Sequence, residues 1–165
     1  MPAAAVAVRR AIQALTDIDC GIKWVNDLYL NEKKVAGILA ESMICGKDQH
    51  VVLGIGINLS TQSFPKELQT TAGCIDLEMS LQRERLLAEI IWQMTPFLSD
   101  PSNDSWLKDY RAASTVLGKP IRWLVGEKSY EGTAEEITST GALLVRDAYG
   151  ERCELSTGEI TVRPR

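Results

Sequence analysis

The chain contains 165 residues, with 18 lysines and arginines against 22 aspartates and glutamates, so its net charge is −4 with the single histidine neutral. This acidic balance excludes a general nucleic-acid-binding protein, since such proteins carry a clustered basic surface. Hydrophobic residues make up 45% and charged residues 24%, a composition typical of a globular chain, so disorder over the whole length is also excluded. The length predicts one domain, or one compact unit with a small appendage.

The first apolar stretch is too short to cross a membrane, because a spanning helix needs about 20 apolar residues and Arg9 and Arg10 end this one. A signal peptide would place its positive charges before the apolar residues and not after them. We therefore expect a cytoplasmic protein without membrane contact.

The cysteines lie at wide and irregular spacings without a Cys-x-x-Cys pair, and only His50 could join them in a zinc site. Reduced thiols are the better interpretation, and no metal-ligating residues are predicted. The four cysteines are Cys20, Cys45, Cys74 and Cys153.

The first predicted element is a helix over residues 2–15, an alanine-rich stretch whose apolar residues recur at helical spacing. Its polar face is small, so most of this helix is expected to be buried. Strands joined by short polar turns follow, which predicts an antiparallel meander. The predicted strands span residues 21–25, 28–30, 34–44 and 50–58.

The middle of the chain is predicted to be helical. Residues 83–98 carry a 3.6-residue apolar period, and Pro96 is expected to kink or end this helix. Shorter helical segments are expected over residues 65–68 and 105–111.

From residue 116 onward, short β-like runs are separated by glycines, which predicts a small barrel and a domain boundary near residues 117–119. The fold class expected is mixed α/β (α+β): a mixed, mostly antiparallel sheet with packed helices, followed by the small barrel. The predicted runs of the barrel are 120–125, 129–137, 142–146, 152–155 and 159–162.

Two residues in the predicted meander call for an explanation. Lys23 lies inside an otherwise apolar strand, so it is either an edge lysine that reaches solvent or an ammonium aimed at an anion. Gly37 also lies inside a strand, where a glycine indicates either a bulge or a close approach by a ligand or another backbone.

A third feature is the run of residues 54–58, Gly-Ile-Gly-Ile-Asn. Gly54 and Gly56 lie on the same strand face, and they leave a bare strip of backbone that ends at the amide of Asn58. Another element packed tightly over the strand, or a ligand, would explain this strip. The run is not the dinucleotide fingerprint, because the third glycine and the following helix are missing.

Together these segments closely resemble the bacterial-type biotin–protein ligases, over essentially the whole chain. Residues 21–30 (Gly-Ile-Lys-Trp-Val-Asn-Asp-Leu-Tyr-Leu) and 33–41 (Lys-Lys-Val-Ala-Gly-Ile-Leu-Ala-Glu) resemble the family's Lys-Trp-Pro-Asn-Asp block and its lysine–glycine strand. Residues 54–59 resemble the strand that follows, and residues 158–163 resemble the end of the family's SH3-like domain. Val25 stands where the family usually has proline, which is expected to loosen the turn before Asn26.

The resemblance also indicates what lies outside this sequence. In the family, an arginine- and glycine-rich adenylate loop and biotin-wrapping strands precede the Lys-Trp block, and bifunctional members add a winged-helix DNA-binding domain. We therefore expect the C-terminal part of a ligase without DNA binding. Residues 1–116 would form an incomplete class II synthetase-like catalytic core, and residues 117–165 the SH3-like domain. This truncation is expected to expose Ile22, Trp24 and the 51–57 strand.

The resemblance implies ATP-dependent formation of biotinyl-5′-AMP, with Mg²⁺ as helper, and then transfer of biotin to a lysine of a biotin carboxyl carrier protein, such as that of acetyl-CoA carboxylase. Fixed cations would offset the repulsion between the biotin carboxylate and the ATP phosphates. Asp27 would orient the lysines or the incoming amine. The residues carried over are Lys23 and Lys34 as catalytic, and Lys23, Gly37, Gly54, Gly56, Asn58 and Arg163 as binding biotin, ATP or the adenylate.

Two other functions compete with this one. The chain could be a catalytically inactive remnant that acts only in protein interaction, or a relative of the lipoate–protein ligases, which share the fold and the chemistry. The Lys-Trp block and the ending of residues 158–163 favour biotin. A homodimer is compatible with all three interpretations.

Overall fold

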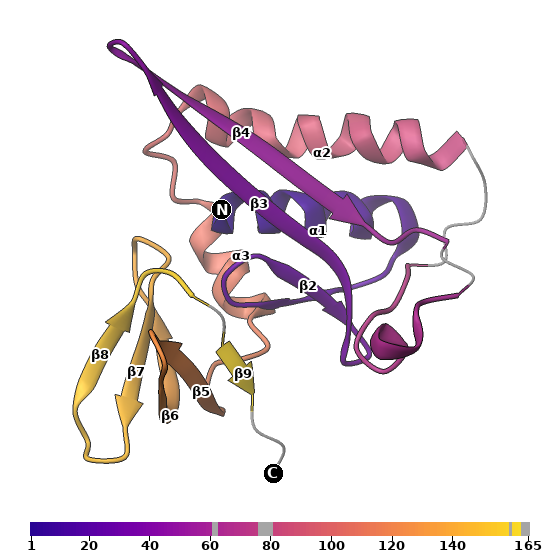
Figure 1. Ribbon diagram of the computed structural model, residues 1–165. Helices are drawn as coiled ribbons and strands as arrows, with labels where there is room; N and C mark the ends of the chain where they lie inside the picture. Colours follow the sequence, from indigo (N-terminus) through magenta and orange to yellow (C-terminus); the bar gives the residue numbers. More distant parts are fainter. Residues whose placement is uncertain (61–62, 76–80, 159, 163–165) are drawn as a thin grey trace.

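The computed structural model describes the whole chain except residues 61–62, 76–80, 159 and 163–165 (Figure 1). It is a mixed α+β fold with two antiparallel sheets, as the sequence predicted. The helices are α1 (Pro2–Thr16), α2 (Leu81–Ser99) and α3 (Trp106–Ala113), with a short 3₁₀ turn η1 (Lys66–Leu68). The strands are β1 (Gly21–Lys23), β2 (Asp27–Leu30), β3 (Lys33–Cys45), β4 (Asp48–Ile57), β5 (Pro120–Val125), β6 (Lys128–Ile137), β7 (Leu143–Asp147), β8 (Arg152–Leu155) and β9 (Ile160–Val162).

The first sheet is the predicted meander, with strand order β1-β2-β3-β4 and every neighbouring pair antiparallel. The β3–β4 hairpin is its longest part, with register partners from Ala36↔Ile57 to Cys45↔Asp48. A shift of register falls between Leu28 and Tyr29, where β2 meets β3. Because Leu28 pairs with Ala36 and Tyr29 with Lys34, the extra residue is Val35, so the bulge lies in β3 but two residues before Gly37, where the sequence allowed it.

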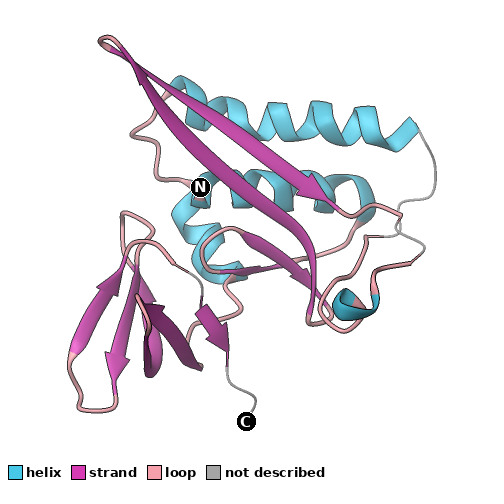
Figure 2. Cartoon of the chain, in the orientation of Figure 1, coloured by secondary structure: helices cyan, strands magenta, loops and turns pink. Residues whose placement is uncertain are grey.

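Helix α1 is the centre of the helical layer. It buries residues on nearly all sides, among them Val6, Val8 and Ile12, so the expectation of a mostly buried helix is confirmed. The helix ends at Asp17, which adopts a left-handed conformation with φ 58° and donates its N–H to Gln13. Figure 2 shows α1 and α2 running side by side, with the β3–β4 hairpin crossing them.

Helix α2 packs Leu86 and Ile90 into the core and extends over Pro96 to Ser99. Of the two alternatives for Pro96, the end of the helix is therefore wrong, and a kink stays a prediction. A proline in the last turn removes one hydrogen bond close to the end of the helix, where the rest of the ladder is already formed. No helix in the described parts of the chain combines the length and the apolar character needed to cross a bilayer.

The second sheet has the order β8-β7-β6-β5-β9, and its strands match the five predicted runs closely. Its strands are antiparallel neighbours, with β8 and β9 at the two edges of the order. This is a five-stranded β domain, and its closure into a barrel stays a prediction. Its inner residues Ile121, Ala134, Ile137, Leu143 and Val145 are fully buried.

The two sheets share one core, which joins them through α3. Arg10 of α1 donates two hydrogen bonds to Asp109 of α3, and Arg111 of α3 donates to the carbonyl of Ile137 in β6. The indole N–H of Trp24 donates to the carbonyl of Gly141 in the second sheet's β6–β7 turn, at 3.0 Å and out of water. These contacts tie the strand that carries Lys23 to the carboxy-terminal sheet.

The expectation that Ile22 and Trp24 are exposed is wrong, since their exposed fractions are 0% and 3%. Ile22 forms a bridge with Ser114 just after α3, and Trp24 reaches Gly141. Elements that are present in the chain therefore cover these two side chains. For the 51–57 strand the outcome is mixed: Val51 and Val52 are exposed, while the isoleucines Ile55 and Ile57 are half-buried.

We predict that Trp24→Phe lowers the free energy of unfolding by about 1–3 kcal/mol, because the Gly141 carbonyl would stay buried without its donor. The measurement is urea-induced unfolding of both proteins. The control is Trp92→Phe, at a tryptophan 70% exposed on α2, which should change the stability by less than about 0.5 kcal/mol. Equal effects of the two substitutions would contradict the assigned role of the indole N–H.

Candidate active site

A cavity of about 1030 Å³ lies where the first sheet meets the carboxy-terminal sheet. Its wall comes from the β1–β2 turn, the first half of β3, the end of β4, residues of the 64–72 segment, and Gly158, Ile160 and Thr161 around the start of β9. These segments lie far apart in the sequence, and the fold brings them together around the cavity. The predicted residues that line the cavity are Lys23, Asp27, Lys34, Gly37, Gly56 and Asn58.

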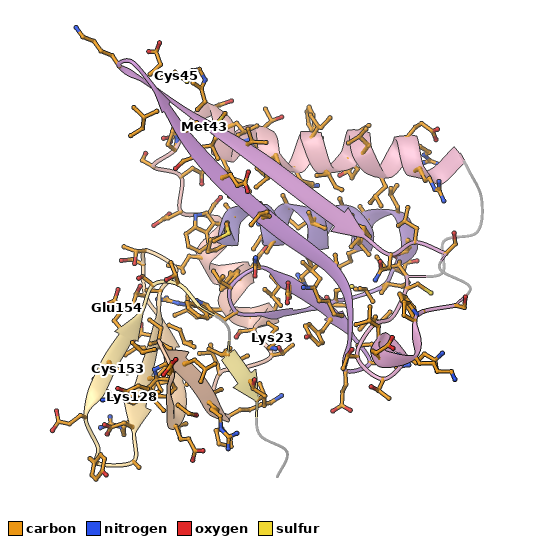
Figure 3. All side chains as sticks on the ribbon, in the orientation of Figure 1. Lys23, Met43, Cys45, Lys128, Cys153 and Glu154 are labelled. Carbon is orange, nitrogen blue, oxygen red and sulfur yellow. The ribbon has the colours of Figure 1, made fainter. Side chains whose placement is uncertain are left out.

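Lys23 is the last residue of β1, at the edge of the first sheet, and it is half-buried. Its ammonium lies 5.5 Å from the ring centre of Tyr29, a cation–π contact. Lys23 also lines a second cavity of about 800 Å³, together with Lys119 and Thr161. Figure 3 shows Lys23 on the side of the first sheet that faces the second sheet. β1 is an edge strand of the first sheet, but the side chain of Lys23 lines both cavities.

The turn after Lys23 is held firmly, although Val25 stands where the resembled family has proline. The Tyr110 hydroxyl donates to the carbonyl of Val25 at 2.8 Å, and the Ile38 N–H donates to the carbonyl of Asn26 at 3.1 Å. Burial raises the pKa of Tyr110, so its hydroxyl stays protonated as a donor at neutral pH. These two hydrogen bonds support the turn, and its loosening by valine stays a prediction.

Lys34 and Asp27 form an ion pair, with 2.7 Å between Nζ and Oδ1. Asp27 is the register partner of Lys23 on one side and of Gly37 on the other. A Cβ at position 37 would lie 3.0 Å from Cε and 3.1 Å from Nζ of Lys34, and 3.3 Å from the Asp27 carboxylate. Gly37 therefore leaves room for this ion pair, an explanation that the sequence did not suggest.

The two glycines of β4 are open to their surroundings. A Cβ at Gly54 or Gly56 would meet its nearest neighbouring atoms only at ordinary contact distances, 3.8 and 3.9 Å. Tight packing of another element over the strand is therefore contradicted. Gly56 lines the larger cavity, whereas Gly54 does not.

Asn58 directly follows β4 and forms hydrogen bonds with the segment of residues 73–75. Its side-chain amide donates to the carbonyl of Gly73 at 3.0 Å, and its backbone carbonyl accepts from Ile75. At least one side-chain amide N–H of Asn58 is therefore hydrogen-bonded within the protein and does not bind a ligand at the same time. Arg163 lies outside the described residues; Thr161 lines both cavities.

The charges of the larger cavity favour an anionic ligand. Among the described residues that line it, the charged side chains are two ammonium groups, Lys23 and Lys34, and one carboxylate, Asp27, which is already paired with Lys34. The described residues also contain no cluster of three His, Cys, Asp or Glu side chains that could hold a metal ion. They do not fit a Mg²⁺ ion held by the protein alone, so a Mg²⁺ here would depend on phosphate oxygens of a nucleotide.

The site includes residues that the sequence analysis missed. Thr71 and Ala72 line the cavity because the 71–73 segment runs along β3, with the N–H of Lys34 donating to Thr71 and that of Gly73 to Lys34. Phe64 and Leu68 line it as well. Residues 65–68 were predicted only as a short helical segment, and residues 71–73 show no periodic pattern at all.

Family comparisons agree with this arrangement. The model of the biotin/lipoate A/B protein ligase family matches residues 1–58, and that of the biotin protein ligase C terminal domain matches residues 116–163. The biotin–[acetyl-CoA-carboxylase] ligase of Mycobacterium tuberculosis is 31% identical over 166 residues, covering 96% of this chain and 60% of that protein. The corresponding ligase of Paracoccus denitrificans is 35% identical over 147 residues, covering 79% and 58%. The bifunctional ligase/repressor BirA of Salmonella typhimurium is 29% identical over 149 residues, covering 86% and 46%, so the chain spans about half the length of these curated relatives.

Solved structures show the same fold. The apo structure of the biotin protein ligase from Aquifex aeolicus superimposes with a TM-score of 0.78 at 25% identity, over 99% of this chain and 74% of that chain. The structure of that ligase in complex with biotin and ATP gives a TM-score of 0.76 at 26% identity, over 99% and 71%. About a quarter of the Aquifex fold thus has no counterpart in the present chain.

We predict that Lys23→Ala, made in a complete ligase that contains this chain, weakens adenylate binding by about 1.5–3 kcal/mol, because a charge-assisted contact is lost. The measurements are calorimetric titration with biotinyl-5′-AMP and the rate of adenylate formation. Lys47→Ala, at an exposed lysine in the β3–β4 turn, is the matched control and should leave both unchanged. Unchanged activation of biotin by the Lys23 variant would mean that Lys23 is only an edge lysine.

Proposed function

Since the chain belongs to the biotin protein ligase family, we propose that it supplies the carboxy-terminal half of a biotin–protein ligase active site. The larger cavity would hold biotinyl-5′-AMP, formed from biotin and ATP. The observation that carries the proposal is the convergence of Lys23, Lys34, Gly56 and Asn58 on one cavity with an excess of positive charge.

In the first step, a carboxylate oxygen of biotin attacks the α-phosphorus of ATP, and pyrophosphate leaves with the bonding electrons. Two anions meet, and charge develops on the phosphoryl oxygens. Lys23 would neutralise this charge from the end of β1, while Asp27 keeps Lys34 in place through the 2.7 Å ion pair. The exposed backbone at Gly56 would let the ligand approach β4 closely.

In the second step, a neutral lysine amine of a biotin carboxyl carrier protein attacks the acyl carbon of biotinyl-5′-AMP. An amide bond forms, AMP leaves, and the amine loses a proton. We propose that the chain meets this carrier in the cytoplasm, since the relatives of Mycobacterium tuberculosis and Paracoccus denitrificans are named for acetyl-CoA carboxylase. Mg²⁺ would enter the site together with the ATP phosphates.

Biotin is a better candidate than lipoate for the acyl substrate. The first family model covers both kinds of ligase, but the second describes a biotin protein ligase domain, and its 116–163 match includes Gly158, Ile160 and Thr161, which line the cavity. The division into a partial catalytic domain, residues 1–116, and an SH3-like domain, residues 117–165, remains part of this proposal.

The carboxy-terminal domain would also contribute a cation to ATP. Arg163 matches the position of the family's terminal arginine, and the proposal is supported by Thr161, two residues earlier, which lines the cavity.

We predict that Arg163→Ala, in the complete enzyme, raises the KM for ATP and leaves the KM for biotin unchanged, since the guanidinium would contact the nucleotide alone. Steady-state kinetics with each substrate varied in turn measure both constants. Arg165→Ala at the last residue is the matched control. If the variant and the parent had the same two constants, the role of Arg163 would be refuted.

We predict further that the 165-residue chain alone does not form biotinyl-5′-AMP at a useful rate. The family's adenylate loop completes the cation set and excludes water, and this sequence holds no Gly-Arg-Gly-Arg run. The assay follows pyrophosphate release that depends on both ATP and biotin. Rapid release by the chain alone would show that its site is already complete.

A further inference from the structure

Tyr29 is a residue of the candidate site to which the proposed function assigns no task. Lys23 and Tyr29 each line both cavities, the larger one and the one of about 800 Å³. Both side chains are half-buried, and the ammonium of Lys23 lies 5.5 Å from the centre of the Tyr29 ring. The ring and the ammonium therefore stand together where the two cavities adjoin.

The strand register explains how the ring reaches the ammonium. Lys23 of β1 pairs with Asp27 of β2, and Tyr29 lies two residues further along β2. Residues two apart in a strand point to the same face, so Asp27 is the direct neighbour of Lys23 and Tyr29 its diagonal neighbour. The register thus offers the ammonium two partners, a carboxylate and an aromatic ring.

The carboxylate is engaged with the other lysine of the site. Asp27 Oδ1 lies 2.7 Å from Nζ of Lys34, and no carboxylate of the described residues forms an ion pair with Lys23. An ion pair sets a negative charge against the lysine that it holds. The face of a ring attracts an ammonium through its quadrupole and adds no net charge. The structure therefore holds Lys34 with a counter-charge, and Lys23 without one.

We infer that Tyr29 is a positioning residue, whose ring holds the Lys23 ammonium at the junction of the two cavities for the phosphoryl oxygens of the adenylate. The inference rests on the proposed function, because it takes the ligand to carry a phosphoryl group. A lysine side chain has a flexible four-carbon stem, and fixing it costs conformational entropy. The ring fixes the ammonium before the ligand arrives, so less of this entropy is lost on binding.

A lysine that only protects an edge strand is the alternative, since edge strands commonly carry lysines that extend into water. Lys23 does not fit this description, because it is half-buried, contacts a ring and lines two cavities. Its neighbours Ile22 and Trp24 are buried and hold the backbone on both sides. The ring of Tyr29 extends this order from the backbone to the end of the side chain.

The first measurement is the NMR spectrum of the 165-residue chain with isotope-labelled lysine. Protons above the face of an aromatic ring are shielded, so we expect the ε-methylene signal of Lys23 upfield of the other lysines; Lys23→Ala identifies this signal by its loss. Tyr29→Leu should return the signal to the position of the other lysines, and Tyr29→Phe should leave it shifted. The matched control is Tyr149→Leu, at a tyrosine 92% exposed between β7 and β8, which should leave it shifted as well.

The second measurement is the rate of biotinyl-5′-AMP formation in a complete ligase that contains this chain. We expect Tyr29→Leu to lower this rate by about three- to tenfold, the effect of losing a partly buried cation–π contact, and Tyr29→Phe to preserve it. In a Lys23→Ala background, Tyr29→Leu should have no further effect, because the ring then has no ammonium to hold. A merely structural role of the ring would persist in that background.

Three results would overturn the inference: a Lys23 signal that Tyr29→Leu does not move, a loss of rate in Tyr29→Leu that is equally large without Lys23, or an equal loss in Tyr29→Phe, which would assign the effect to the hydroxyl. A signal that moves in Tyr29→Leu, together with an unchanged rate in Lys23→Ala, would support the ring contact and refute the proposed function of Lys23. The two failures are therefore distinguishable.

Discussion

The burial of the short strand β1 between α3 and the carboxy-terminal sheet is the constraint on which the rest of the structure depends. Ile22 is fully buried, and Trp24 inserts its indole under the second sheet to reach the carbonyl of Gly141. Lys23 stands between these two anchors. The burial of Ile22 and Trp24 thus fixes the position of the Lys23 ammonium, because the free energy gained by burying these two side chains holds the backbone on either side of Lys23.

The packing of Ile22 and Trp24 also explains why the candidate site depends on both sheets. The first sheet supplies Lys23, Asp27 and Lys34, and the region around β9 supplies the opposite wall with Ile160 and Thr161. Within the first sheet, the glycine at position 37 makes space for the Lys34–Asp27 ion pair. The positive charge of the cavity therefore depends on the lysine residues themselves, on the strand register that places them, and on the packing of the two sheets against each other.

The hairpin formed by β3 and β4 is much more exposed than the buried region around Ile22 and Trp24. Ile22 of β1 is fully buried, whereas the tip of the hairpin extends past the helices (Figure 1). The apolar side chains of Met43, Ile44, Val51 and Val52 on the hairpin are exposed. The region that holds the charged groups is therefore packed into the fold, and the outer part of the hairpin is not.

The sequence alone determined the local elements, since apolar runs joined by short polar turns in residues 21–58 and glycine-separated runs after residue 116 are properties of neighbouring residues. It also marked Lys23 and Gly56, because a lysine or a glycine in an apolar strand is unusual by itself. Burial of Ile22 and Trp24, space at Gly37 for an ion pair, and the approach of residues 71–73 to β3 were decided only by the tertiary structure. Each of these depends on residues far apart in the chain, whose distances no local pattern encodes.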